Sequence, residues 1–277
     1  MIPDARVLTQ ARKFAAEMIG GWRELTGEQK SHDGLVWEYV VEDDRLDIAE
    51  PEEGDPIADG GFAFRDDATK QADFEEWLDT QIRNEVLEPV GDRQLKNGGH
   101  YSGKYVRATN DSGIRDAGTW MRKEGIEPAY GRENLDQVFN APVRVEQLGT
   151  LYRRTYRELK GVTDDAAKEI SRELAEGLSQ GWNPRKVATR INERIDARGI
   201  AGSRRIARTE MARSYNHGSL LRYRRNDIKK TAIQNTSPCK KICAPLVADN
   251  PYSLDEAYGI LPAHPNCMGS WKPVISS

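Results

Sequence analysis

The sequence has only three cysteines among its 277 residues, and it lacks any apolar run long enough to span a bilayer. Its N-terminus also lacks the charged segment followed by an apolar one that marks a secretory signal peptide. We therefore expect a soluble protein that folds in a reducing cytoplasm, where disulfides are rare. No glycine-rich phosphate loop precedes a predicted helix and no Ser/His/Asp set can be assigned, so phosphate-loop and acyl-transfer chemistry are not predicted.

The net charge of −3 is the sum of an acidic stretch with few basic residues and a basic stretch with fewer acidic ones. Residues 31–93 hold 20 acidic and 5 basic side chains, a net charge of −15. Residues 153–241 hold 22 basic and 10 acidic side chains, a net charge of +12. A basic half suits a polyanion such as nucleic acid, or an acidic protein surface. The alternative is that Lys and Arg simply cover solvated helix faces, since few aromatic residues interleave this stretch to stack on bases.

The three cysteines lie beside one of the four histidines, in the order Cys239, Cys243, His264 and Cys267. Three thiolates and an imidazole are the ligands of a closed structural zinc site, and this spacing joins two short segments across a loop. The sequence therefore predicts a structural Zn²⁺ at these residues. Two alternatives stay open, namely buried cysteines with a solvated histidine, and a disulfide from Cys239 to Cys243 or Cys267.

Apolar periodicity predicts a mainly α-helical protein. Residues 1–139 are expected to form a helical region with an acidic insertion at about 31–64, which carries a β-hairpin with one strand at 35–41. Residues 140–277 are expected to form a helical domain that ends in a small β/zinc knuckle. Expected helices cover residues 5–25, 67–88, 101–123 with a break at 110–113, 131–138, 143–159, 163–181, 183–199 and 204–226, and expected strands cover 231–235 and 271–275.

Thr163 and Ser203 are predicted N-caps of separate helices because their side chains suit that position. The helix pair at 163–181 and 183–199 is compatible with a DNA-binding helix-turn-helix, but helical hairpins of this kind are common. We expect Arg208, Glu210 and Asn216 to form a buried network that links the last long helix to the metal knuckle. The alternative is ordinary pairing at the surface.

The C-terminal half resembles the phage Mu F-like minor head proteins, also called phage head morphogenesis proteins. The likeness covers residues 140–275, and several motifs occur in the family's order. This sequence departs from the family in having three residues between Cys239 and Cys243 in place of two, and Gly269 where a further cysteine is usual. The motifs that carry the resemblance are Ala207-Arg-Thr-Glu210, Tyr215-Asn216, Cys239…Cys243, Leu254-Asp-Glu-Ala257 and Pro262-Ala-His-Pro-Asn-Cys267.

The resemblance implies a low-copy structural protein, not an enzyme, inside the head of a tailed double-stranded DNA virus. Such a protein is made in the host cytoplasm and joins the assembling capsid near the portal vertex. Its expected partners are the portal protein, the major capsid or scaffolding protein, and packaged double-stranded DNA contacted without sequence preference. No membrane partner is expected.

Two other functions remain compatible with the same residues. The first is a zinc-dependent DNA-binding regulator, which would bind duplexes with sequence preference. The second is an HNH-type nuclease, which needs a histidine base beside a metal that activates water. Here His264 is the nearby histidine, and the zinc prediction already uses it.

Overall fold

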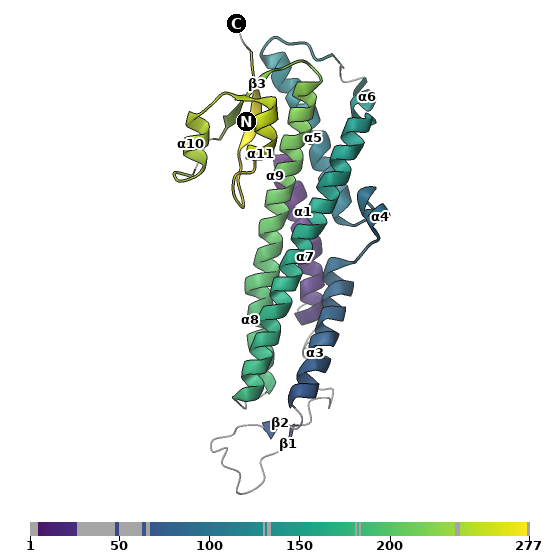
Figure 1. Ribbon diagram of the computed structural model, residues 1–277, viewed down its shortest axis with the longest axis vertical. Coiled ribbons are helices and arrows are strands. Elements are labelled where there is room, and N and C mark those ends of the chain that lie inside the picture. The colour runs from purple at the N-terminus through teal and green to yellow at the C-terminus, as the bar shows by residue number, and fades with distance from the viewer. Residues whose placement is uncertain are drawn as a thin grey trace. The chain divides into compact units, whose positions relative to one another are not determined.

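The computed structural model describes residues 5–26, 48–49, 63–64, 67–129, 131, 134–180, 182, 184–235 and 239–275. These residues confirm a mainly helical protein with a small antiparallel sheet near the C-terminus (Figure 1). The strands are β1 (Ile48–Ala49), β2 (Ala63–Phe64), β3 (Lys230–Gln234), β4 (Tyr252–Ser253) and β5 (Ser270–Val274). The helices are α1 (Ala5–Thr26), α3 (Asp67–Ile82), α4 (Asp92–Lys96), α5 (Ser102–Lys123), α6 (Leu135–Phe139), α7 (Pro142–Ser179), α8 (Pro184–Arg194), α9 (Ala201–Arg224), α10 (Cys243–Ala248) and α11 (Leu254–Ile260), with π-helical segments η2 (Arg83–Leu87) and η4 (Ile195–Ile200).

The chain forms two compact units, and each is assembled from separate stretches of sequence. Helices α1, α7 and α9 contribute residues to both units. The units therefore differ from the predicted division into residues 1–139 and 140–277, because long helices pair with partners far away in the sequence. Unit 1 comprises Met1–Ala15, Val90–Arg157 and Arg204–Ser277, and unit 2 comprises Ala16–Pro89 and Glu158–Ser203.

Unit 2 has the amphipathic helices that the periodicity predicts. Leu78, Ile82 and Val86 recur every fourth residue through α3 and η2, and all three are buried. The short strands β1 and β2 pair antiparallel, with Ile48 opposite Phe64, which agrees with a hairpin in the acidic insertion. The predicted strand at 35–41 lies outside the described residues.

The predicted N-caps at Thr163 and Ser203 are wrong, because α7 runs unbroken through Thr163, and η4 and α9 continue helically through Ser203. Thr163 is buried and its hydroxyl donates to the carbonyl of Lys160, a bond that a threonine inside a helix can make. The Ser203 hydroxyl accepts a hydrogen bond of 3.1 Å from the indole N–H of Trp22. Both hydroxyls form hydrogen bonds inside unit 2, so neither residue acts as an N-cap.

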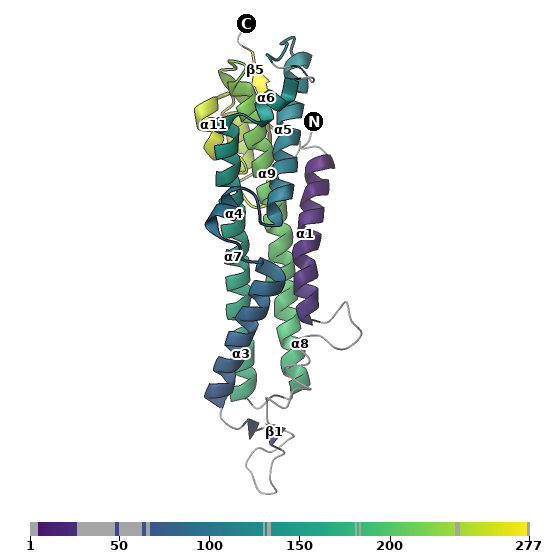
Figure 2. The same cartoon turned by 90° about the vertical axis from the view of Figure 1, so that its right-hand side faces the viewer.

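In unit 1, α5 and α9 cross closely, and this contact explains why the predicted break at 110–113 is wrong (Figure 2). A Cβ atom on Gly113 would lie 2.1 Å from the carbonyl oxygen of Tyr215, so only glycine permits this approach. The Asn110 amide donates to the Ser214 carbonyl at 3.1 Å, and the Ser214 hydroxyl donates to the Val106 carbonyl at 2.7 Å. Asn110 and Gly113 belong to residue types that usually interrupt a helix, but here they form the contact of α5 with α9.

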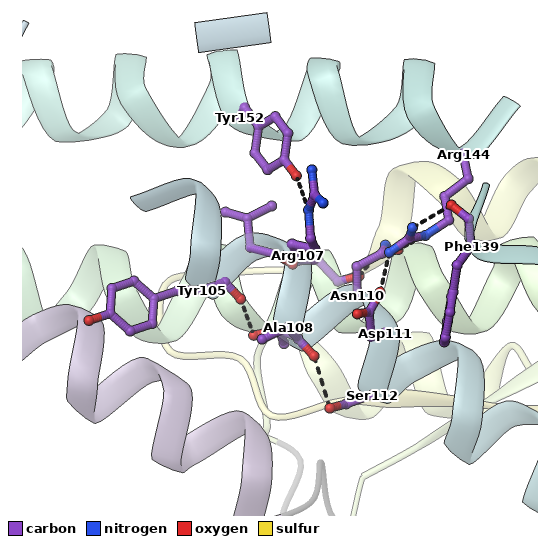
Figure 3. Close-up of polar contacts among 12 residues, drawn as sticks. Tyr105, Arg107, Ala108, Asn110, Asp111, Ser112, Phe139, Arg144 and Tyr152 are labelled. Carbon is purple, nitrogen blue, oxygen red and sulfur yellow. Dashed lines mark hydrogen bonds and ion pairs between the residues drawn. The ribbon is translucent and has the colours of Figure 1, made fainter. Parts of the chain in front are cut away.

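A buried arginine joins α5, α6 and α7 within unit 1 (Figure 3). The Arg144 side chain donates from Nε to Asn110 Oδ1 at 3.1 Å and from Nη1 to the Phe139 carbonyl at 2.6 Å. Its Nη2 atom makes an ion pair with Asp111. Arg144 is 4% exposed and Asn110 is fully buried, so the charge is compensated by fixed partners and not by water.

The three-stranded sheet packs at one end of α9 and covers the last turns of α5. Its strand order is β4-β3-β5, and the β3–β5 register places Ile233 opposite Trp271. Both strands confirm the sequence prediction. The buried core shared by the sheet and the helices consists of Ala117, Met121, Leu220, Tyr223, Ile228, Ile233, Cys243, Leu254, Ala257, Leu261, Cys267 and Trp271.

Candidate metal centre

Cys239 begins a turn that leads into α10, and Cys243 is the first residue of that helix. The Cys239 carbonyl accepts from the Ala244 N–H at 3.0 Å, and the Cys239 sulfur accepts from the Cys243 N–H at 3.4 Å. A spacing of four residues places side chains on the same face of a helical turn. The three-residue gap between the cysteines is therefore compatible with two sulfurs that face one ion.

His264 reaches these sulfurs from a separate turn after α11. That turn is closed by a backbone hydrogen bond of 3.0 Å from Cys267 to His264, and the Asn266 N–H donates to Thr209 Oγ1 on α9 at 3.1 Å. His264 Nδ1 lies 2.8 Å from the Pro265 carbonyl oxygen. A carbonyl oxygen can only accept, so Nδ1 is the donor in this contact, and a ring that is protonated at Nδ1 alone keeps the lone pair of Nε2. This is the tautomer that binds metal through Nε2.

The three ligand atoms Cys239 Sγ, Cys243 Sγ and His264 Nε2 lie within 4.8 Å of one another. His264 Nε2 is 3.5 Å from the Cys239 sulfur and 2.9 Å from the Cys243 sulfur. A tetrahedral zinc ion would separate a sulfur and a nitrogen ligand by about 3.6 Å, from its usual bond lengths. The distance from Nε2 to the Cys239 sulfur fits this value, whereas the Cys243 sulfur and Nε2 would have to move apart to bind one zinc ion. These three residues could hold a metal ion.

The two thiols of the pair have opposite environments. Backbone N–H groups of Cys243 and Ile242 stabilise the Cys239 thiolate and lower its pKa to about 7. Burial raises the pKa of Cys243 to about 12, and the neighbouring thiols of Cys239 and Cys267 act in the same direction. A bound cation would favour both thiolates and so lower the pKa of both cysteines, because metal ligands must be deprotonated.

The fourth predicted ligand, Cys267, does not lie within 4.8 Å of all three other ligand atoms. It is 1% exposed and belongs to the core beneath the sheet, close enough to Cys243 to affect the pKa of that thiol. All three cysteines are free in the structure. The burial of Cys243 and Cys267 is also what the interpretation as small core residues predicts.

The predicted network from α9 to the knuckle is only partly correct. Asn216 is fully buried and donates from Nδ2 to the Gly269 carbonyl at 3.1 Å, which links α9 to the chain after the metal residues. Glu210 is also buried but pairs with Arg154 on α7 and with Arg213. Arg208 is exposed, so its predicted place in a buried network is wrong. Thr209, which lies between Arg208 and Glu210 in the chain, supports the turn of His264 and had no predicted role.

His217 is largely buried, and its lowered pKa predicts that the stability of the protein depends on pH. Burial, followed by the charges of Arg213 and Arg154, lowers its pKa to about 4, and its ring packs edge-on against Tyr258. In the unfolded chain a histidine has a pKa of about 6.5, so between these two values the unfolded chain binds a proton that the folded protein excludes. The free energy of unfolding should therefore fall as the pH decreases through this window, by roughly 3 kcal/mol in total.

Urea denaturation of the wild type and of His217→Gln across this pH range tests the prediction. The variant is expected to be less sensitive to acid, and the difference in unfolding free energy between the two proteins should change only between about pH 6.5 and pH 4. Carboxylates also titrate near the lower end, but they are present in both proteins. A difference that is constant with pH would contradict this role of His217.

Among the described residues, no helix has both the length and the apolarity needed to cross a membrane. Comparisons with family models, with curated proteins and with solved structures found no match to this chain.

Proposed function

We propose that this protein is a structural component of the head of a tailed double-stranded DNA virus, a minor head protein that acts near the portal vertex. The proposal rests on the resemblance of residues 140–275 to the Mu F-like minor head proteins. One observation carries it furthest, namely that motifs far apart in the sequence meet in space. The Asn266 N–H donates to Thr209 Oγ1, which joins two of these motifs, and the Asn216 amide donates to the carbonyl of Gly269, two residues beyond the last motif.

These contacts suggest what the metal residues do. Two α9 residues fix the backbone on either side of Cys267, while His264 faces the cysteine pair at the start of α10. An ion bound there would connect the turn after α11 to α10 and stiffen the small sheet on its helical support. We assign this ion, with zinc as the expected metal, a structural role in an assembly protein and not a role in catalysis.

The expected partners are the portal protein and the major capsid or scaffolding protein, with non-specific contact to packaged DNA. The uneven charge of the sequence favours this arrangement, because the basic stretch at 153–241 suits DNA and the acidic stretch at 31–93 suits a basic protein surface. The protein would be made in the host cytoplasm and retained in the capsid interior.

Purified virus particles test the proposal. We expect a tagged copy of the protein to copurify with DNA-filled heads at low copy number, and to bind the portal protein of the same genome when the two are coexpressed. Absence from DNA-filled particles would contradict the proposal.

The two alternative functions have distinct outcomes in vitro. Sequence-specific binding to short duplexes at physiological salt would favour a zinc-dependent regulator. Plasmid nicking with Mg²⁺ or Mn²⁺ that is lost in His264→Ala would favour an HNH-type nuclease. We expect neither activity.

A further inference from the structure

Unit 1 contains a cavity of about 340 Å³ that the proposed function does not use. It lies where α4, α5, the end of α6 and the start of α7 meet. Four of its lining residues, Arg107, Phe139, Arg144 and Tyr152, are labelled in Figure 3. Its lining includes three cationic side chains, Lys96, Arg107 and Arg144. Among the described lining residues there is no carboxylate.

The three cations differ in how they are held. Arg144 is buried and fixed by Asn110, Asp111 and the Phe139 carbonyl, which together use three of its five N–H groups. Lys96 and Arg107 are exposed, and neither forms an ion pair with any residue that the structure describes. The cavity therefore has one rigid cation and two accessible ones.

A tyrosine positions one of the accessible cations. Arg107 Nε donates to the hydroxyl of Tyr152 at 3.2 Å, and the two side chains point toward each other in Figure 3. This bond leaves both terminal nitrogens of the guanidinium available to a ligand. It also leaves the hydroxyl hydrogen of the tyrosine, which finds no acceptor in the described part of the chain. Arg107 and Tyr152 can thus donate to one anion together.

The charge of this site defines its ligand. The formal charges of Lys96, Arg107 and Arg144, less that of the adjacent Asp111, leave a net charge of +2. A phosphate monoester carries a charge of about −1.5 to −2 at neutral pH and offers three acceptor oxygens, whereas a phosphodiester carries only about −1. Phe139 and Leu148 supply an apolar wall beside the cations. We propose that this cavity binds a terminal phosphate group attached to a less polar body, as in a nucleotide.

Two sources supply this chemistry, a free nucleoside monophosphate and the phosphorylated end of a nucleic acid strand. Calorimetric titration of the full chain with adenosine monophosphate and with adenosine tests the site, since the two differ only in the phosphate. A DNA duplex with 5′-phosphate ends, compared with the same duplex with 5′-hydroxyl ends, identifies the second source. Phosphate-dependent binding to either pair supports the proposal.

The decisive variant is Lys96→Gln with Arg107→Gln, which removes the two exposed cations and leaves the Arg144 network in place. We expect affinity for the phosphorylated probe to fall at least about tenfold, because each charge-assisted hydrogen bond contributes substantially to binding. The matched control is Lys123→Gln with Arg205→Gln, which removes one exposed lysine and one exposed arginine of unit 1 outside the cavity. The control should change affinity by less than about twofold.

Equal losses in the pocket variant and in the control would overturn the proposal, because binding would then reflect general positive charge. The absence of any preference for phosphorylated probes would also overturn it. A thermal unfolding curve of the pocket variant that matches the wild type separates loss of the ligand site from loss of fold. None of these results depends on whether the protein is a head component.

Discussion

Purification under reducing conditions without chelator is expected to yield protein with about one zinc ion per chain. Cys243→Ser and His264→Gln should each reduce the zinc content by at least about tenfold, because both residues supply ligand atoms to the same group. Metal analysis by mass spectrometry measures this directly. His217→Gln is the control, since it changes a histidine of the same unit that has no predicted metal role, and its zinc content should match the wild type.

Loss of the metal should also have a local structural effect. In Cys243→Ser, or after treatment with a strong chelator, we expect amide hydrogen exchange to become faster in α10, α11 and the β4-β3-β5 sheet. The crossing of α5 with α9 should keep its protection, because its own buried contacts hold it. Wild-type protein that contains no zinc, or a chelator that leaves exchange in this region unchanged, would contradict the metal prediction.

Cys267→Ser distinguishes a closed site from an open one. If Cys267 is the fourth ligand, its substitution should remove zinc as completely as that of Cys243, which is the outcome we predict. Retention of zinc would leave water as the fourth ligand, and an open position of this kind is typical of catalytic zinc. That result would weigh against the structural role that we assign to the ion.

The second large effect is expected at Arg144. Replacement by methionine removes a buried cation but leaves Asp111, Asn110 Oδ1 and the Phe139 carbonyl without it. Breaking a buried pair from one side typically costs about 3–5 kcal/mol, so the free energy of unfolding should fall by this amount. Urea denaturation followed by circular dichroism measures the change.

Arg153→Met is the matched control because Arg153 also lies on α7 and pairs with a carboxylate, Asp92, but at the surface. An exposed pair contributes about 0–1 kcal/mol. Adding Asp111→Leu to Arg144→Met should recover part of the lost stability, since both charges are then absent. Similar effects of the two arginine substitutions would contradict the importance of the buried network.

Most of the helices could be predicted from local pattern, and the failures share one cause. Asn110, Gly113, Thr163 and Ser203 belong to residue types that end or begin helices, yet each lies inside a helical run. Such preferences amount to about 1 kcal/mol, and burial against another helix outweighs them. The importance of Arg144 was missed for a related reason, since nothing in the residues next to it in the chain distinguishes a buried arginine from an exposed one.

Local sequence was sufficient to predict the helical class, the two strands around the cysteines, and the group of Cys239, Cys243 and His264. These features depend on periodicity and on short turns, which residues close together in the chain define. Only the tertiary structure shows where helices continue, which arginine is buried, and that Cys267 lies in the core outside the close group of Cys239, Cys243 and His264. Each of these depends on contacts between residues about a hundred positions apart, or on packing of a side chain within the core, and local sequence does not encode either of them.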